Sequence, residues 1–231
     1  MRILTNERRY RQGRFWATTL SVAGLLMLIT ATVTSFIPQI GPSSFPLLIF
    51  GIILSLVGIR LSHRWVRSPL AHEVLAGALK GLSKDSLLLN YYPLAPHLLI
   101  TPNGVFSLTT RNQPFQITVS GDHWTDEASA FKKLRRQLGQ DQLGNPIAQA
   151  KRDAERASAW IEKTLSAKLT VTPLVVFLNS ATHLEVEQQT AVPMTYADKR
   201  TPSLKAYLKQ DSAAVLTSKQ LDDLLTTLQT S

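Results

Sequence analysis

Two uncharged apolar runs near the N-terminus constrain the fold of this chain more than any other feature. The first runs from Phe15 to Ile37, and its 23 residues suffice to span a bilayer core of about 30 Å at about 1.5 Å per residue. The second runs from Phe45 to Ile59, and it reaches Leu61 if Arg60 extends back to the headgroups. We expect both runs to cross a membrane as helices, and a re-entrant or interfacial second segment is the alternative.

A secretory signal peptide is the competing interpretation of the first run, because five arginines precede it. Signal peptides have an apolar core of roughly 7–15 residues followed by a small-residue cleavage site. This run is longer than such a core, and a second apolar run follows it closely. We therefore expect the first helix to be retained as an anchor.

Arginines flank the pair of runs at its two outer ends. They are Arg2, Arg8, Arg9, Arg11 and Arg14 before the first run, and Arg60, Arg64 and Arg67 after the second. Residues 38–44, which connect the runs, carry no charge. Positive residues concentrate in the cytoplasmic flanks of membrane helices. The pattern predicts a multi-pass protein of the cell membrane, with both termini cytoplasmic and the lipid bilayer as a partner.

This topology divides the chain into five parts. We expect a basic cytoplasmic N-terminus at residues 1–14, membrane helices at 15–37 and 45–61, a short extracytoplasmic loop at 38–44 and a cytoplasmic domain at 69–231.

The basic flanks also account for most of the net charge of +9. The first fourteen residues contribute +4 and the three arginines after the second run contribute +3, which leaves +2 for the rest. Net charge is therefore a topology signal here and no argument for nucleic acid, although anionic lipid would add roughly 1 kcal/mol per basic residue near the surface. The absence of cysteine excludes disulfides, thiolate metal sites and a cysteine nucleophile.

The segment that follows reads as a helix and several strands. Apolar residues recur at helical spacing from Leu70 to Leu82. Apolar or alternating runs of strand length then extend over Ser86 to Tyr92, His97 to Thr101, Val105 to Thr110 and Phe115 to Val119. We expect these strands to form a meander of about four strands.

The C-terminal half predicts further helices around one covered strand. We expect a helix from Thr125 to Leu138, a longer helix opened by Asn145 and Pro146, a strand covered on both faces from Val171 to Leu178, a strand from Leu184 to Glu187, a short helix after Pro202 and a closing helix from Ser218 to Leu228. This order predicts one α/β domain with a mixed sheet. The sequence contains no zinc motif, hydrolase triad, glycine-rich phosphate loop or dinucleotide fingerprint.

Four segments carry a family resemblance: Leu87 to Asn90, His97 to Phe106, Gly121 to Trp124 and Asn145 to Ala150. In combination they resemble the nuclease-related domain (NERD) family, over residues from about 70 to 179. The resemblance implies a restriction-endonuclease-like fold, with a mixed sheet flanked by helices. It also implies an active site built from an Asp on one strand and a Glu-x-Lys on the next.

The residue types of that site follow from its chemistry. The carboxylates bind a divalent metal ion that activates water, and the lysine positions or polarises the attacking water. In this sequence the Asp falls on Pro96, and the Glu and Lys fall on Thr109 and Arg111. Thr109 cannot replace an anionic ligand, Pro96 offers only a carbonyl, and Arg111 keeps its charge without easy deprotonation. The resemblance therefore implies a degenerate catalytic site with no metal and no cofactor.

Some polar positions of the family pattern remain. Glu73 lies on the first helix, where relatives often carry a glutamate near the site, and Gln149 matches the helix glutamine of the family. A solvated helix face is the alternative for both. Arg111 would clamp a phosphate bidentately or pair with an acid as an exposed strand residue. Asp122 would serve as a migrated carboxylate, or make the turn after Gly121.

A basic cluster offers a further candidate for nucleic-acid binding. It consists of Lys132, Lys133, Arg135 and Arg136. A solvated face of a helix is the alternative interpretation of such a charge run.

Three functions remain open on this reasoning. The first is a membrane-tethered, catalytically degenerate module that binds nucleic acid or a protein partner. The second is an active, divergent nuclease in which Glu73, Asp122 and Gln149 rebuild a Mg²⁺ site. The third is a membrane scaffold whose helical hairpin associates with partners through small residues. Those residues are Gly24, Ala31, Gly51 and Gly58.

Overall fold

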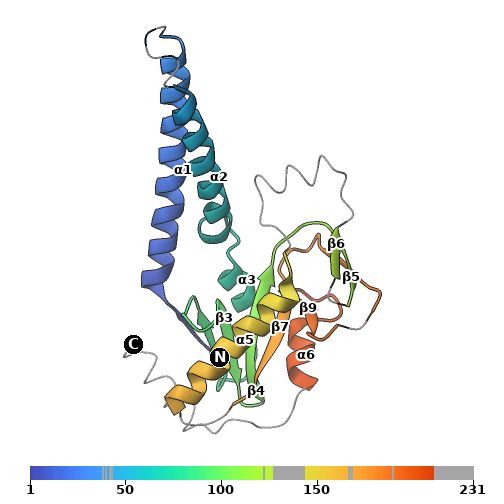
Figure 1. The fold of residues 1–231 in the computed structure, drawn as a ribbon. Coiled ribbons are helices and arrows are strands. Elements are labelled where there is room, and N and C mark those ends of the chain that lie inside the picture. Colours follow the sequence, from blue (N-terminus) through green and yellow to red (C-terminus); the bar gives the residue numbers. More distant parts are fainter. Residues whose placement is uncertain are drawn as a thin grey trace. The chain divides into compact units, whose positions relative to one another are not determined.

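The computed structural model describes residues 1–37, 39, 41, 44–121, 123–126, 144–165, 169–188 and 190–210. These residues form two compact units. The helical unit takes Glu7–Leu70, and the α/β unit takes Met1–Asn6 together with the described chain from Ala71 onward (Figure 1). Each unit is described separately below.

The helical unit is a pair of long helices, α1 (Glu7–Ser35) and α2 (Ser44–Trp65). Both are long and apolar enough to cross a membrane, and only 17% of the most apolar window of each is buried. The core helix of a soluble protein would be mostly buried, so these helices present apolar side chains outward. Helix α1 begins eight residues before the apolar run at Phe15, because the arginine-rich segment is itself helical and Glu7 suits its first turn.

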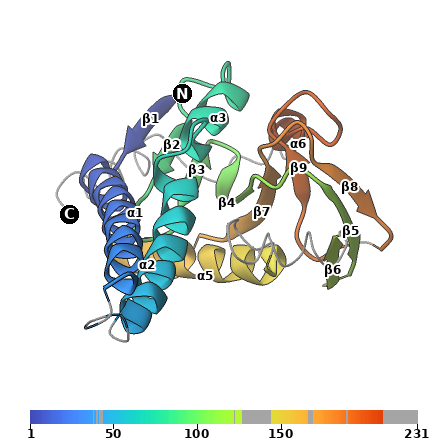
Figure 2. The ribbon, with the colours of Figure 1, turned by 90° about the horizontal axis from the view of Figure 1, so that it is seen from above.

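The two helices lie side by side (Figure 2), and small residues form the contact between them. The buried positions recur every seven residues: Ala17, Gly24 and Ala31 on α1, and Ser44, Gly51 and Gly58 on α2. A Cβ added at Gly58 would lie 2.6 Å from the backbone nitrogen of Ser21, and one at Gly24 would lie 2.6 Å from that of Ser55. The backbones therefore touch directly, as in membrane helix pairs built on small residues. A seven-residue repeat is the spacing of a left-handed helical seam.

These small residues serve the contact within the hairpin. Gly24, Gly51 and Gly58 each face the other helix, and Ala31 is fully buried in the same stripe. They therefore supply no exposed small-residue face for a partner helix.

A short N-terminal strand belongs to the α/β unit, which sequence reasoning missed. Strand β1 (Arg2–Thr5) pairs in parallel with β2 (Leu87–Asn90), and Asn6 N donates to Asn90 O at 3.0 Å. Four residues are too few to show a periodicity, and their partner lies far along the chain. The helical pair is consequently inserted between the first strand of the sheet and the remainder, rather than preceding the whole domain.

The main sheet has six strands in the order β1-β2-β3-β4-β7-β9. The strands not yet named are β3 (His97–Thr101), β4 (Gly104–Arg111), β7 (Val171–Phe177) and β9 (Met194–Tyr196). β2, β3 and β4 are antiparallel, whereas β4, β7 and β9 are parallel. The prediction of a mixed sheet is confirmed, as is a covered strand after the long helix, because β7 is buried over most of its length.

The expected four-stranded meander is wrong at its fourth strand. β5 (Gln116–Ser120) leaves the main sheet and forms a smaller sheet with β6 (His123–Asp126) and β8 (His183–Val186). The reason is that β7 pairs with β4 over seven residues, which occupies the edge that β5 would need. Strand β6 also takes Thr125 and Asp126, where the sequence predicted the start of a helix.

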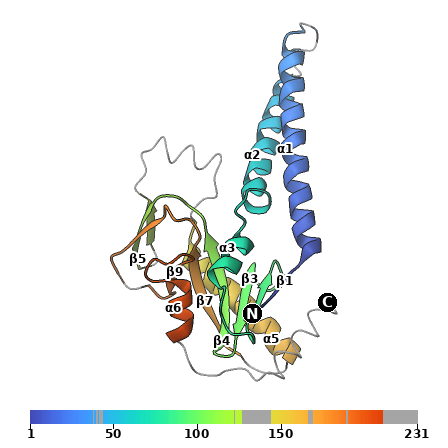
Figure 3. The same cartoon turned by 180° about the vertical axis from the view of Figure 1, so that it is seen from behind.

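Helices cover the two faces of the main sheet (Figure 3). α5 (Pro146–Leu165) packs on one face, and α3 (Ala71–Ala78) and α6 (Leu204–Gln210) pack on the other. The predicted cap of α5 is confirmed, because Asn145 Oδ1 accepts a hydrogen bond from Ala148 N at 2.9 Å and Pro146 opens the helix. The expected helix at residues 218–228, and that at 125–138 beyond residue 126, lie outside the described residues.

The pairing of β1 generates a stability prediction. Leu4 packs partly buried against the core beneath α5, whereas the neighbouring Ile3 is 44% exposed. We expect Leu4→Ala to lower the free energy of unfolding by about 1–2 kcal/mol, below the range for fully buried leucines. The matched change Ile3→Ala should cost less than about 0.5 kcal/mol. Denaturant unfolding of the full chain in detergent measures both, and equal effects would contradict a docked β1.

The helix contact generates a second prediction. The Oγ atoms of Ser21 and Ser62 lie 3.4 Å apart, so Ser21→Cys with Ser62→Cys should oxidise readily in a chain that has no other cysteine. Adding Gly58→Ala should slow this crosslink several-fold, because the new Cβ meets the backbone of Ser21. Gly77→Ala is the control, since nothing lies within 4 Å of its added Cβ. An unchanged rate in Gly58→Ala would refute the close contact.

Candidate functional site

The candidate site lies on the face of β4 that packs against α5. Side chains alternate between the faces of a strand. Phe106 and Leu108 belong to the cluster with α3 and α6, so Ser107, Thr109 and Arg111 lie on the α5 face. Two of the three positions implied by the family resemblance, Thr109 and Arg111, are therefore together at the end of this strand.

Arg111 is fixed by the first turns of α5. Its Nη2 donates to Gln149 Oε1 at 2.8 Å, and its Nη1 donates to the carbonyl of Thr110 at 2.9 Å. Gln149 is half-buried on the helix that Asn145 caps. The structure thus brings Arg111 and Gln149, both named from the sequence, into direct contact.

One turn further along α5, the carboxylate of Asp153 joins this pair. Asp153 is only 6% exposed. Burial raises the pKa of its carboxyl, and a hydrogen bond from Gln149 and the charges of Arg156, Arg152 and Arg111 partly oppose the rise. Gln149 is therefore a bridge: its carbonyl oxygen accepts from the guanidinium, and its amide nitrogen donates to the carboxylate.

Two buried hydroxyl groups lie on the same face of β4 as Arg111. Thr109 is 1% exposed, and among the described residues its Oγ1, Ser107 Oγ and Asp153 Oδ2 have no hydrogen-bond partner. The antiparallel register pairs Leu98 with Ser107, and continuing it by two residues sets Pro96 opposite Thr109. Pro96 itself lies just before β3, in the connection from β2.

The other residues predicted from the sequence either lie away from the Arg111 site or fall outside the described residues. Glu73 is exposed on α3, whose buried Leu75 packs on the opposite face of the sheet together with Leu79, the residue after the helix. Asp122 lies outside the described residues. The same holds for the basic cluster Lys132, Lys133, Arg135 and Arg136.

Sequence reasoning missed Asp153, although a signal for it was present. It follows Gln149 by four residues and adjoins Ala154, so helical spacing alone puts it on the sheet-facing side of α5. A carboxylate on that side is unusual enough to mark it as a candidate.

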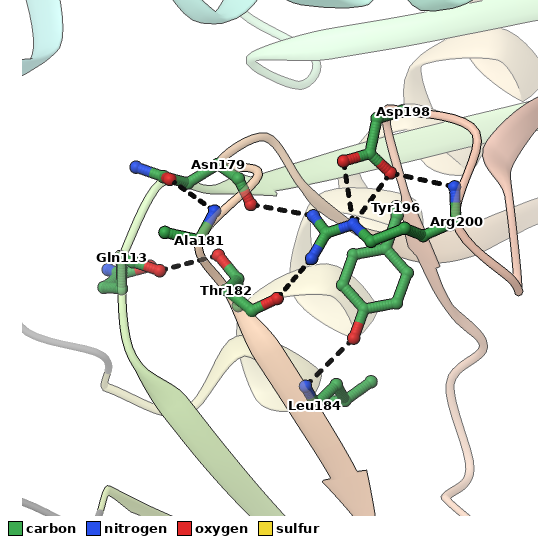
Figure 4. Close-up of polar contacts among 8 residues, drawn as sticks. All are labelled: Gln113, Asn179, Ala181, Thr182, Leu184, Tyr196, Asp198 and Arg200. Carbon is green, nitrogen blue, oxygen red and sulfur yellow. Dashed lines mark hydrogen bonds and ion pairs between the residues drawn. The ribbon is translucent and has the colours of Figure 1, made fainter.

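A second arginine nearby has a structural role (Figure 4). The guanidinium of Arg200 donates to the carbonyls of Asn179 and Thr182, binds the carboxylate of Asp198 at 2.8 Å and lies 4.2 Å from the centre of the Tyr196 ring. All three of its nitrogens therefore serve the fold, and they hold the chain after β7 against the end of β9.

The same close-up shows hydrogen bonds that connect these residues to the smaller sheet (Figure 4). Tyr196 Oη accepts a hydrogen bond from Leu184 N at 2.9 Å, and Thr182 Oγ1 donates to Gln113 O at 2.7 Å. These contacts fix the exit from β4 just beyond Arg111. Arg200 is consequently excluded as a ligand-binding group, and Arg111 is the arginine of the candidate site.

The described residues offer a poor metal site. No three His, Cys, Asp or Glu side chains lie close enough together to hold a metal ion in that part of the chain. The candidate site contains one carboxylate and one guanidinium. This donor set suits hydrogen bonding to an anion better than ligation of a hard cation.

Comparison with known families found one match. Residues 72–178 match the nuclease-related domain family. The chain carries a nuclease-related domain. The match spans α3 to β7 and includes all the site residues, whereas β1, β9 and α6 lie outside it. Searches of curated proteins and of solved structures gave no match.

The buried carboxylate of the nuclease-related domain predicts a pH effect. Its raised pKa means that the folded state keeps the proton of Asp153 to higher pH than the unfolded state, so the folded chain loses stability as pH rises from about 4. Asparagine has the same shape and does not titrate. We therefore expect Asp153→Asn to gain stability over the parent as pH rises toward neutral.

Urea unfolding of the full chain at several pH values measures this difference. Asp85→Asn, at an exposed position, controls for the loss of one negative charge. A stability difference between Asp153→Asn and the parent that is the same at every pH would contradict the assignment.

Proposed function

We propose that this protein is a membrane-anchored nuclease-related domain that binds nucleic acid without cleaving it. One observation supports the proposal above all: Arg111 occupies the lysine position of the family pattern, and Gln149 holds it at 2.8 Å. The positions of the two acids are Pro96 and Thr109.

The absence of cleavage follows from the charges at the site. Hydrolysis by the family mechanism needs carboxylates to hold a metal ion that activates water. Here a guanidinium, which stays protonated, lies near the single acid, Asp153, whose pKa is already raised by burial. A divalent cation entering this site would meet a permanent positive charge in place of a second carboxylate.

Binding of phosphate follows from the same geometry. A guanidinium is a planar fork that matches two phosphate oxygens, and an arginine held in one orientation loses less freedom on binding. Gln149 and the Thr110 carbonyl orient Arg111 at the end of β4. We infer that a phosphodiester group contacts Arg111.

Strand β1 supports anchoring by both helices. Residues 1–6 and the chain after Ala71 belong to one compact unit, so they lie on the same side of any membrane. An even number of crossings must therefore separate them, and α1 and α2 both span or neither does. Cleavage after α1 as a signal peptide would also remove β1 from its sheet. We propose that both span, with the basic flanks and the domain in the cytoplasm.

A divergent nuclease is the second candidate function. The set of Glu73, Asp122 and Gln149 is not supported, because Glu73 lies on α3, across the sheet from Gln149. Asp153 favours this candidate instead, since it supplies a carboxylate beside Thr109 and Arg111 through α5. No observation favours a membrane scaffold, because the small residues of the hairpin are buried in its own contact.

Incubation with supercoiled plasmid tests the proposal. We use the full chain in detergent, since a fragment starting at residue 69 would lack β1. With Mg²⁺ or Mn²⁺ the plasmid should remain intact, and its retention should weaken as salt rises, because binding displaces counterions. Arg111→Gln should weaken retention about 5-fold or more, the cost of roughly one charged hydrogen bond.

Lys199→Gln, which removes one exposed charge elsewhere, should leave retention nearly unchanged. Metal-dependent cleavage that disappears in Asp153→Asn would establish the divergent nuclease instead. Failure of the parent to retain plasmid at low salt would exclude nucleic acid as the ligand.

A further inference from the structure

Seven arginines gather at one end of the helical unit. They are Arg8, Arg9, Arg11 and Arg14 on α1, Arg60 and Arg64 on α2, and Arg67 two residues after its end, and all are exposed. The helices are antiparallel, and a Cβ added at Gly13 would lie 2.4 Å from the ring of Trp65, so these two groups of arginines are at the same end of the pair. We call them the arginine collar.

Residues 7–70 carry a large excess of positive charge. Glu7 is the only acidic residue from Glu7 to Leu70, against seven arginines. The opposite end of the hairpin, at residues 36–43, has no charged residue at all. The helical unit is therefore strongly polarised along its length.

The arginines also form same-sign stripes on each helix. Arg8, Arg11 and Arg14 are three residues apart on α1, and Arg60 and Arg64 are four residues apart on α2. Side chains at these spacings are neighbours on a helix surface, and like charges there repel. An anion that contacted several of these arginines at once would relieve this repulsion.

The apolar surface begins where the collar ends. Phe15 and Trp16 follow Arg14 directly and are 61% and 56% exposed, and Ile59 precedes Arg60 and is 41% exposed. Arg64 lies over the ring of Trp65 at 5.4 Å. Arginine and tryptophan side by side at the edge of an apolar band are typical of the headgroup level of a bilayer. A nucleic acid has no apolar region beside its phosphates that would match these exposed apolar side chains.

We propose that the arginine collar binds the headgroups of anionic phospholipids. The ligand is a phosphodiester with no compensating amine, as in phosphatidylglycerol, held between arginines of the two helices. This proposal rests on the membrane anchoring proposed above, and it is independent of nucleic-acid binding at Arg111. The collar then does more than orient the hairpin, because it selects the lipids around it.

Thermal unfolding of the full chain in a neutral detergent tests this selectivity. Added phosphatidylglycerol should raise the Tm of the parent by at least about 3 °C, whereas phosphatidylcholine should not. The triple variant Arg60→Gln, Arg64→Gln and Arg67→Gln should lose at least half of the shift. The matched triple variant Lys151→Gln, Lys163→Gln and Lys199→Gln removes the same charge from exposed positions of the α/β unit and should keep it.

Three further arms identify the ligand and keep the test decisive if a variant folds poorly. In the parent, high salt should abolish the phosphatidylglycerol shift, and inorganic phosphate at equal concentration should not reproduce it. Equal shifts with both lipids would overturn the proposal. A larger shift with a short DNA duplex, lost in the collar variant, would show that the collar is a nucleic-acid surface instead.

Alkaline extraction of membranes separates this inference from the proposed anchoring. Release of the full chain into the soluble fraction would show that the helices do not span, and would overturn both. Retention in the membrane without a phosphatidylglycerol shift would overturn the collar alone.

Discussion

The pairing of β1 with β2 is the interaction on which the arrangement of this protein depends. Four residues at the start of the chain close an edge of the main sheet, and both flanks of the helical pair are thereby tied to one folded unit. A hairpin tied in this way crosses a membrane twice or not at all. The same pairing makes the domain discontinuous in sequence, so that its first strand and its second are separated by the whole of α1 and α2.

Within the domain, the contacts from Arg111 through Gln149 to Asp153 connect β4 to α5 and form the candidate site. It uses the geometry of a nuclease-related domain, in which β4 and α5 bring the family positions to one face. The residue types here are a guanidinium and a single buried carboxylate, where the family resemblance implies a metal-binding pair of acids. A site of this kind stabilises an anion by fixed hydrogen bonds and lacks the ligands for metal-activated water. This is the physical basis of our proposal that the domain binds without cleaving.

Charge is distributed in two regions of different character. The arginine collar is exposed at one end of the helical pair, next to apolar side chains, whereas Arg111 is partly buried in a polar bridge. In a protein with a nuclease-related domain, all of a large net positive charge could be attributed to nucleic-acid binding. The helical unit holds most of it, and there it adjoins a band suited to lipid. The two regions therefore have different ligands in our proposals, and each is tested separately.

Local pattern determined much of this protein. The two apolar helices, the capped start of α5 and the covered strand β7 all follow from residue types within a few positions of each other, whereas Arg111 and Gln149 were named from the family resemblance. Tertiary structure alone decided three features. β1 finds a partner 85 residues away, β5 leaves the main sheet because β7 occupies its edge, and the pKa of Asp153 rises because α5 packs onto β4. Each depends on contacts between distant segments, and periodicity within a segment carries no information about which distant surface will cover it.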